Sequence, residues 1–303
     1  MGEYIRSPLI RLMYEKLEHQ NKHLHSNHDN WYDYRPEYVD FEFRDIFIQS
    51  YQDEETCKFL DNCYMKSDWL FTHFYHAIVK AALTWFMTST SINGLVGRGS
   101  MFVFSSAQFL HLLNVNEDFK SDFLLDLGAG DGNVTLKMSP YFKMVYVTEI
   151  SPVMRWRLSK HGFSILDVDS WKLISKQLDT PEVPSHFDVI SCLNLLDRCT
   201  APITLLKRIN QALKPITGIL ILGIVLPLKQ YVETTHDQRP NEILDIVDSE
   251  LWEVQLSSLI KNILIPANFN ILRWTRLPYL CEGDFLKSFY YLNEIILVLQ
   301  TTI

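Results

Sequence analysis

Short apolar runs, each ended by polar or glycine residues, recur through the second half of the chain. They occupy positions 123–125, 144–147, 163–168, 187–193 and 218–226. Apolar runs of this length are typical of strands that are buried on both faces of a parallel sheet. Two helical segments, 151–160 and 202–212, alternate with them. The alternation predicts a doubly wound α/β domain, because parallel strands need crossover helices and these cover both faces of the sheet.

The last part of the chain predicts a change of strand direction. Residues 241–262 have helical character, and two final strands are expected at 270–274 and 295–299. A loop over 278–284 is expected between these strands. The pair predicts an antiparallel edge on the otherwise parallel sheet.

The N-terminal 40 residues are polar and aromatic, and they show little periodicity. Four histidines cluster there, His19, His23, His25 and His28. Their spacing fits no standard pair of helical metal ligands, so a flexible, solvated tail is favoured over a metal site.

A helix is expected over 53–90, and its segment 69–88 is apolar enough to raise the question of a membrane span. Polar residues recur every four positions in that segment, at Thr72, His76, Lys80 and Thr84. A lysine at the centre of a bilayer costs about 2.5–3.5 kcal/mol, so a mostly buried helix of a globular domain is the better interpretation. The following glycine-rich stretch, 90–100, is either a plain connector or a ligand-contacting loop.

The segment 123–150 holds the features around which the rest of the chain is organised. Its first strand leads through Asp126 into Gly128, Gly130 and Gly132, and its second strand ends on Glu149. Glycines let the backbone turn tightly and let a ligand approach the N-terminus of a helix closely. A carboxylate about 20 residues beyond such a turn accepts ribose hydroxyls in nucleotide-binding folds. The segment therefore predicts a ligand that contains a ribose.

Two cofactors compete for this turn. The dinucleotide fingerprint is G-x-G-x-x-G, whereas this chain has G-x-G-x-G with two acids, Asp126 and Asp131. A pyrophosphate would be repelled by acids in a partly dry cleft. S-adenosylmethionine has no phosphate and carries a cationic sulfonium and an ammonium group, so the acids favour it. The remaining alternative, a turn without a ligand, is disfavoured by the acid at the end of the second strand.

Composition narrows the class of protein. Of 303 residues, 47% are hydrophobic and 21% charged, which is typical of a globular protein with a sizeable core. The balance of 28 basic against 36 acidic residues gives a net charge of −8, which does not indicate a nucleic-acid surface. The five cysteines include no C-x-x-C pair and favour a reducing compartment over disulfides or a zinc cluster. The first ten residues do not resemble a secretory leader.

Asn194 and Asp197 follow the fourth predicted strand. Ligands of doubly wound sheets bind beyond the carboxyl ends of the strands, so this pair is expected in one crevice with Glu149 and Asp169. In methyl transfer the protein aligns a nucleophile and, where needed, removes its proton. An amide and a carboxylate one helical turn apart suit a nitrogen nucleophile that bears an N–H. The alternative is that Asp197 caps the next helix and pairs with Arg198.

Four motifs carry a resemblance to one known family. They are LLDLGAGDG from Leu124, SCLNLLDRC from Ser191, TRLPYLCEGD from Thr275 and TSINGLVGRGSMF from Thr90. From about Trp31 to its end the chain resembles the DREV family of methyltransferases. The resemblance implies a seven-strand, Rossmann-like (class I) fold that uses S-adenosyl-L-methionine. It also implies methylation of the pros nitrogen, Nδ1, of histidine in H-x-H motifs, where x is usually small.

The resemblance assigns roles to individual residues. Those implied at the cofactor are Asp126, Gly128, Gly130, Glu149, Asp169 and Asn194. Those implied at the histidine and its peptide are Asn194 and Asp197, as the catalytic pair, with Tyr279 and Tyr290. No metal is implied. Two departures from the family pattern are Asp169, where an asparagine is usual, and a longer segment over 176–185.

The expected division of the chain is a flexible segment over 1–40, a helical extension covering the active site over 41–115, and a methyltransferase domain over 116–303. The expected partners are proteins that contain H-x-H motifs, with no nucleic acid and no integral membrane span. The expected location is intracellular and cytoplasmic, with association with endomembranes or mitochondria as the alternative. Two other functions stay open: methylation of a small molecule, an RNA or another protein side chain, and a non-catalytic module that binds the donor.

Overall fold

The computed structural model describes residues 28–67, 99–169, 171, 183–232, 237–284 and 287–302, together with residues 10, 11, 14, 17 and 18. Several predictions fall outside these ranges and are not tested by the structure. They are the helix beyond Ser67, most of the glycine-rich stretch over 90–100, His19, His23 and His25, and most of the segment over 176–185. Among the described residues no helix combines the length and the apolar character needed to cross a membrane.

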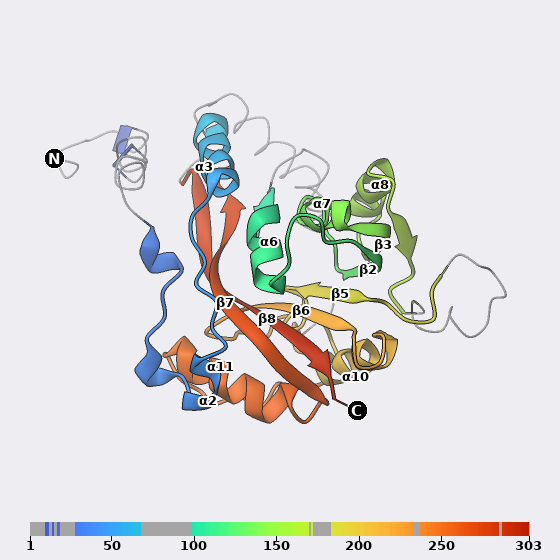
Figure 1. The fold of residues 1–303 in the computed structure, drawn as a ribbon. Coiled ribbons are helices and arrows are strands. Elements are labelled where there is room, and N and C mark those ends of the chain that lie inside the picture. Colours follow the sequence, from blue (N-terminus) through green and yellow to red (C-terminus); the bar gives the residue numbers. More distant parts are fainter. Residues whose placement is uncertain are drawn as a thin grey trace.

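The described residues form one eight-stranded sheet in the order β1-β7-β8-β6-β5-β2-β3-β4 (Figure 1). The strands are β1 Met101–Phe102, β2 Ser121–Leu127, β3 Phe142–Thr148, β4 Ser164–Leu166, β5 Val189–Leu193, β6 Ile219–Val225, β7 Phe269–Glu282 and β8 Phe289–Thr301. Strands β2 to β6 pair in parallel, and β8 is antiparallel to both of its neighbours, β6 and β7. The predicted doubly wound sheet with an antiparallel pair at one side is therefore confirmed, with the two-residue strand β1 added beyond β7.

Helices cover both faces of the sheet (Figure 1). The helices are α2 Phe41–Arg44, α3 Glu54–Ser67, α6 Ser106–Leu113, α7 Thr135–Met138, α8 Pro152–Lys160, α10 Pro202–Ala212 and α11 Trp252–Leu259, which continues as the π-helical turn η5 Ile260–Leu264. One core packs α10 and α11 on the sheet, through Leu206 and Leu256. The other packs α3 and α6, through Leu60 and Phe109. The sheet is therefore buried on both sides, which explains its nearly continuous apolar strands.

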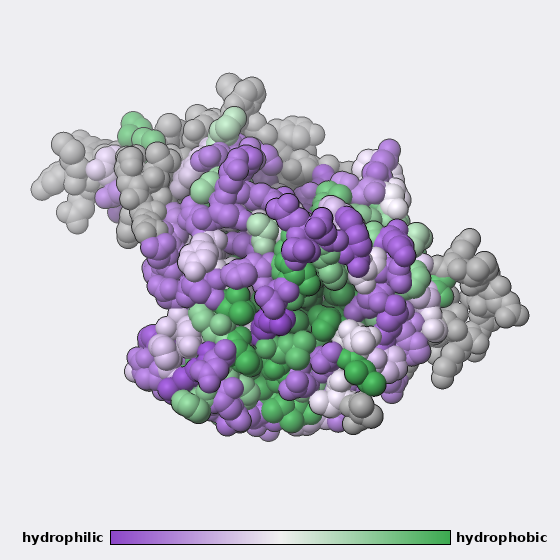
Figure 2. All heavy atoms as spheres, in the orientation of Figure 1, coloured by the Kyte–Doolittle hydropathy of each residue, from purple (hydrophilic) through white to green (hydrophobic). Residues whose placement is uncertain are grey.

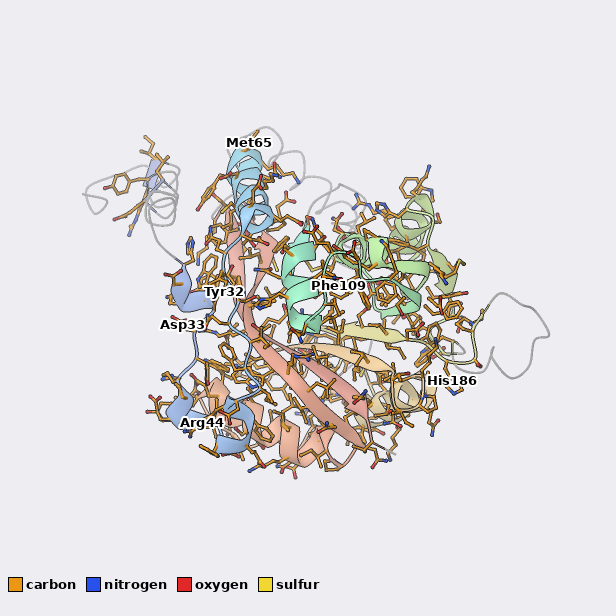
Figure 3. All side chains as sticks on the ribbon, in the orientation of Figure 1. Tyr32, Asp33, Arg44, Met65, Phe109 and His186 are labelled. Atoms are coloured by element: carbon orange, nitrogen blue, oxygen red, sulfur yellow. The ribbon has the colours of Figure 1, made fainter. Side chains whose placement is uncertain are left out.

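The segment before α3 packs along the β7–β8 hairpin, as the positions of Tyr32 and Asp33 in Figure 3 show. It is tied to Trp274 of β7, whose indole N–H donates to the Phe43 carbonyl at 2.7 Å. Three-residue 3-10 turns, η2 Asp29–Trp31 and η3 Pro36–Tyr38, lie in this segment. Trp31 is buried and stacks on His28, with the ring centroids 3.8 Å apart. The prediction of a solvated tail is therefore wrong for His28 and Trp31.

Two helices that position the site are capped as their sequences indicate. Ser105 and Gln108 form a reciprocal capping box at the start of α6, with both bonds at 2.9 Å. Ser151 accepts from the Met154 N–H at the start of α8, and Pro152 occupies the first helical position. The predicted helices 151–160 and 202–212 are confirmed to within one residue.

The predicted helix over 241–262 is wrong for its first half, since regular helix begins only at Trp252. The backbone before it bonds to other parts of the chain: the Asn241 N–H donates to the Thr200 carbonyl at 2.7 Å, and the Leu244 N–H donates to the Gln230 side chain at 2.8 Å. These partners replace the bonds that a helix would have supplied, so tertiary contacts override the local pattern.

The predicted loop over 278–284 is also wrong. Strand β7 continues through it to Glu282, and β8 begins at Phe289, so the pair is far longer than the two short strands expected. Pro278 interrupted the strand pattern because proline has no N–H for a ladder. It is tolerated because β7 is nearly an edge strand, which β1 pairs only at Leu280 and Cys281.

Candidate active site

The sheet topology brings the chemistry-bearing residues to one edge. Strands β2, β3, β4 and β5 are parallel, so the residues that follow their carboxyl ends lie together. Strand β8 runs the other way, and therefore its first half lies at this same edge, with Glu294 paired to Val225 at the end of β6. Figure 2 shows apolar side chains gathered over the middle strands, within a polar rim.

The glycine turn after β2 closes against the end of β3. The backbone N–H groups of Gly128 and Ala129 both donate to the Thr148 carbonyl at 3.0 Å. Gly128 and Gly130 have φ values of 71° and 56°, a left-handed conformation that glycine adopts without a steric penalty. The turn therefore needs glycine for its shape, and it presents bare backbone at the end of the strand.

Glu149 fixes the turn from the end of β3. One carboxylate oxygen accepts from the Gly130 N–H at 3.0 Å, and the other accepts from the Ser151 N–H at 2.8 Å. Each oxygen keeps a lone pair, and the side chain is half-buried rather than enclosed. Glu149 can therefore still accept a hydroxyl of a ligand that lies against the turn.

Asp126 is buried near the end of β2, just before the glycine turn. Its two oxygens accept from the hydroxyls of Thr135, at 2.5 Å, and Ser191, at 2.7 Å. Burial raises the pKa of the Asp126 carboxyl to about 6. Because Asp126 is only 3% exposed and each of its oxygens accepts a hydroxyl inside the protein, the geometry supports a role in shaping the turn.

Asp131 and Asp169 differ in their surroundings. Asp131 is buried and accepts from the backbone and side-chain N–H groups of Asn133, at 3.0 and 2.6 Å. Burial raises the pKa of the Asp131 carboxyl. Asp169 is exposed in the turn after β4, where its N–H donates to Asp167 at 2.9 Å. Trp171 behind it is buried.

Asn194 begins the segment after β5 and has a left-handed backbone, with φ of 53°. Its N–H donates to the Gly223 carbonyl at 2.9 Å, and its side-chain amide N–H donates to Glu294 at 2.8 Å. The side-chain oxygen of Asn194 is buried and has no hydrogen-bond partner among the described residues. A buried acceptor without a partner is costly, which suggests that a ligand supplies the donor.

Asp197 is 3% exposed, and one of its carboxylate oxygens is also a buried acceptor without a hydrogen-bond partner among the described residues. Its Oδ2 pairs with the Arg198 guanidinium at 3.1 Å, while Oδ1 is buried without a partner among the described residues. Burial raises the pKa of the Asp197 carboxyl, and Arg198 opposes that shift. The alternative of a helix cap does not hold, because α10 begins after Ala201 and has no side-chain cap. The pairing with Arg198 is confirmed.

Glu294 is the site residue that the sequence pattern missed. It is 0% exposed, and its Oε2 is a third buried acceptor without a partner among the described residues. Burial raises the pKa of the Glu294 carboxyl to about 8, and nearby Asp197 adds to the shift. In the sequence, Glu294 is visible only as a carboxylate directly before the apolar run 295–299. That position indicates a site residue only once β8 is known to run antiparallel to β6.

Tyr279 and Tyr290 lie on the β7–β8 hairpin. The register pairs Leu277 with Glu294 and Cys281 with Tyr290, so the two tyrosines share the face of the hairpin that carries Glu294. Tyr279 is largely enclosed and donates its hydroxyl to the Met101 sulfur, and burial raises its pKa well above 10. Tyr290 is exposed and donates to Asp284 at 2.9 Å.

A cavity of 280 Å³ adjoins the turn between α3, β1 and the start of α7. Its lining includes Asn133 and Val134, which follow the glycines, and Met101. The Met101 methyl group would lie 3.7 Å from a Cβ added at Gly130. Among the described residues no group of three His, Cys, Asp or Glu side chains is arranged to hold a metal ion.

The strand order, the glycine turn and Glu149 define a class I methyltransferase that uses S-adenosylmethionine. Residues 31–301 match the family model described as DREV methyltransferase, and the chain belongs to that family. The match covers the N-terminal segment packed along β7 as well as the sheet.

Solved structures with related folds are distant. The CurJ carbon methyltransferase is 17% identical, with 75% of this chain and 58% of that chain covered and a TM-score of 0.43. The N-methyltransferase NodS from Bradyrhizobium japonicum, in complex with S-adenosyl-L-homocysteine, is 15% identical, with 65% and 86% covered and a TM-score of 0.40. Magnesium protoporphyrin IX methyltransferase from Synechocystis, with bound donor, is 15% identical, with 64% and 77% covered and a TM-score of 0.37.

Proposed function

We propose that this methyltransferase acts on proteins and transfers the methyl group to Nδ1 of histidine in H-x-H motifs. The resemblance of its Asn194–Asp197 and Tyr279 motifs to the DREV pattern supports this substrate. The net charge of −8 favours a peptide over a nucleic acid as the partner.

The proposal rests on the buried polar atoms without a hydrogen-bond partner near the carboxyl end of β5. Three buried side-chain atoms there have no partner among the described residues: Asn194 Oδ1, Asp197 Oδ1 and Glu294 Oε2. Asn194 Oδ1 and Asp197 Oδ1 are acceptors, whereas the pKa of about 8 leaves Glu294 mostly protonated at neutral pH. A substrate that satisfies Asn194 and Asp197 must therefore bring donors. Nitrogen nucleophiles with an N–H fit this requirement, and a carboxylate nucleophile does not.

Neutral imidazole carries an N–H on one ring nitrogen and a lone pair on the other. A hydrogen bond accepted from one nitrogen fixes the proton there and leaves the lone pair on the other nitrogen. When Asp197 Oδ1 accepts from Nε2–H, the lone pair lies on Nδ1. S-adenosylmethionine supplies an electrophilic methyl group on a sulfonium when bound. As the N–C bond forms and the C–S bond breaks, Asp197 stabilises the positive charge that develops on the ring. The Nε2 proton then passes to Asp197 and on to solvent, so the methylated ring is neutral again and S-adenosylhomocysteine is the second product.

The residues present fit the donor. Glu149 keeps lone pairs toward the turn for the two ribose hydroxyls, and the backbone of Gly128 and Gly130 permits close approach. Asp169, with Trp171 behind it, would lie at the adenine. Asp126 would act indirectly, since its oxygens are occupied by Thr135 and Ser191.

Tyr279 and Tyr290 would flank the peptide, because both lie on the hairpin face that carries Glu294. Their rings offer apolar surface and a polar hydroxyl, a combination that suits recognition of a second histidine in the motif. Tyr290 is exposed, which supports a role at the rim of such a site.

The experiment is incubation of the protein with labelled donor and an H-A-H peptide, followed by tandem mass spectrometry and chromatographic separation of the two methylhistidine isomers. The expected product is a single Nδ1-methylhistidine. The control peptide carries glutamine at both histidines, and the control variant is Asp197→Ala. A protein that binds S-adenosylhomocysteine but leaves the H-A-H peptide unmodified would contradict the proposed substrate.

A further inference from the structure

Glu294 determines which way the side chain of Asn194 points. The backbone of Asn194 is held by the Gly223 carbonyl at 2.9 Å, and its amide Nδ2 donates to Glu294 Oε1 at 2.8 Å. A carboxamide has donors on one side and an acceptor on the other. A bond that fixes Nδ2 on Glu294 therefore turns Oδ1 of Asn194 in the opposite direction, where it has no partner among the described residues.

Glu294 is not explained by packing. It precedes five fully or nearly buried positions of β8, and no ion pair to it is found within the described residues. A buried carboxylate without a cation is destabilising, so it is seldom retained without a specific use. The sheet also makes room for it, because a Cβ on Gly223 would lie 2.5 Å from Glu294 Oε1.

We propose that Glu294 is a positioning residue for methyl transfer: by accepting the Asn194 Nδ2–H, it directs the Asn194 oxygen to the methyl-accepting group. The inference rests on the proposed function for the identity of that group. Asn194 Oδ1 and Asp197 Oδ1 then act together as acceptors around a ring that becomes positively charged. A flipped amide would instead present N–H groups, which repel the developing charge.

The test compares Glu294→Gln with Glu294→Met. Glutamine keeps an oxygen that can accept from Nδ2, and we expect kcat on the H-A-H peptide to stay within about threefold of wild type. Methionine keeps the volume and removes the acceptor, and we expect kcat to fall about 10²-fold, the scale of misplaced reacting groups. Affinity for S-adenosylhomocysteine should be unchanged in both. The control is Glu253→Gln, a buried carboxylate on α11 that pairs with Arg35 at 2.8 Å; its kcat should be unchanged.

A double-mutant cycle separates positioning from packing. With Asn194→Ala as background, Glu294→Met should cost no further turnover. Multiplicative losses would overturn the inference, as would a Glu294→Gln variant as slow as Glu294→Met. A wild-type protein inactive on the H-A-H peptide would instead count against the proposed substrate alone.

A second readout does not depend on turnover, and its first measurement uses the wild-type protein. In ¹⁵N-labelled wild-type protein, the Asn194 side-chain N–H that bonds Glu294 should exchange with solvent slowly. Glu294→Gln should preserve that protection, and Glu294→Met should remove it. Exchange in wild type as fast as that of an exposed asparagine amide, such as Asn116, would overturn the inference even if Glu294→Met fails to fold.

Discussion

The Glu149 carboxylate joins Gly130 to Ser151, accepting their N–H groups at 3.0 and 2.8 Å. The acid at the end of β3 thus ties the glycine turn after β2 to the start of α8. Glu149 therefore holds the backbone of the turn, and in the proposed function it would also accept the ribose hydroxyls of the donor.

Replacing Glu149 with alanine should abolish donor binding while the protein stays folded, since a half-buried carboxylate at a strand end is not core packing. Titration calorimetry with S-adenosylhomocysteine measures the binding, and thermal unfolding checks the fold. The matched control is Asp122→Ala, at the opposite end of β2, where the carboxylate pairs with Lys143 at 2.6 Å. Wild-type affinity in folded Glu149→Ala would remove the ribose assignment.

Asp197→Asn should retain donor binding and lose turnover by roughly 10²–10⁴-fold, the usual contribution of positioned acid–base or orienting groups. An amide carries no charge to stabilise the imidazolium, and it presents N–H groups where an acceptor is required. Single-turnover kinetics with an H-A-H peptide measures the loss separately from product release. The comparison is Asp118→Asn, an exposed residue ahead of β2, which should turn over at the wild-type rate. Turnover of Asp197→Asn within a few-fold of wild type would leave Asp197 with only its pairing to Arg198.

The glycine turn also imposes a packing requirement, which two alanine variants separate. Gly132 and Gly162 both have left-handed backbones, with φ of 84° and 79°. A Cβ on Gly132 would lie 2.9 Å from the buried Leu158 side chain. A Cβ on Gly162 would have no neighbouring atom within 4 Å among the described residues. Both variants should lose about 1–2 kcal/mol of stability to backbone strain. Gly132→Ala should lose about 1–3 kcal/mol more from overpacking. Urea denaturation measures both, and equal losses would contradict the packing argument.

The sequence carried enough information for the parallel half of the sheet and the donor turn. Strands β2 to β6 are buried on both faces, so their apolar runs are local signals, and Glu149 falls at a spacing that the β-α-β unit fixes. Glu294 could not be predicted as a site residue, because its role depends on contacts with distant parts of the chain. It lies 100 residues from Asn194 in the chain, and only the antiparallel pairing of β8 with β6 brings the two together.

The misplaced elements have the same origin. Residues 241–250 have helical character locally, but their N–H groups bond to Thr200 and Gln230, which no local pattern shows. Pro278 indicates a loop in isolation, and it is accommodated because β7 has little pairing on its outer side. In both cases the deciding interaction is with a distant part of the chain, so local propensity gave the wrong answer.

The buried Glu294 should make stability fall as the pH rises. Its pKa is raised from 4.5 to about 8 by burial, so the folded state holds the proton more tightly than the unfolded state. This contribution is complete below about pH 4.5 and is lost as the pH rises through about 8, at up to about 1.4 kcal/mol per pH unit. The groups that act electrostatically with Glu294 are Asp197, Tyr279 and Cys281.

Glu294→Gln has no proton to lose, and its side-chain oxygen can still accept from Asn194. Its stability relative to wild type should therefore increase steadily between pH 5 and pH 8. Urea denaturation of both proteins at several pH values measures the difference in their free energies of unfolding. The contributions of the other titrating groups are shared by the two proteins and largely cancel in this difference. The control is Glu54→Gln on the surface of α3, because its bond with Lys58 lowers the Glu54 pKa and predicts no such gain. Parallel stability curves for wild type and Glu294→Gln would show that Glu294 titrates normally in the folded protein.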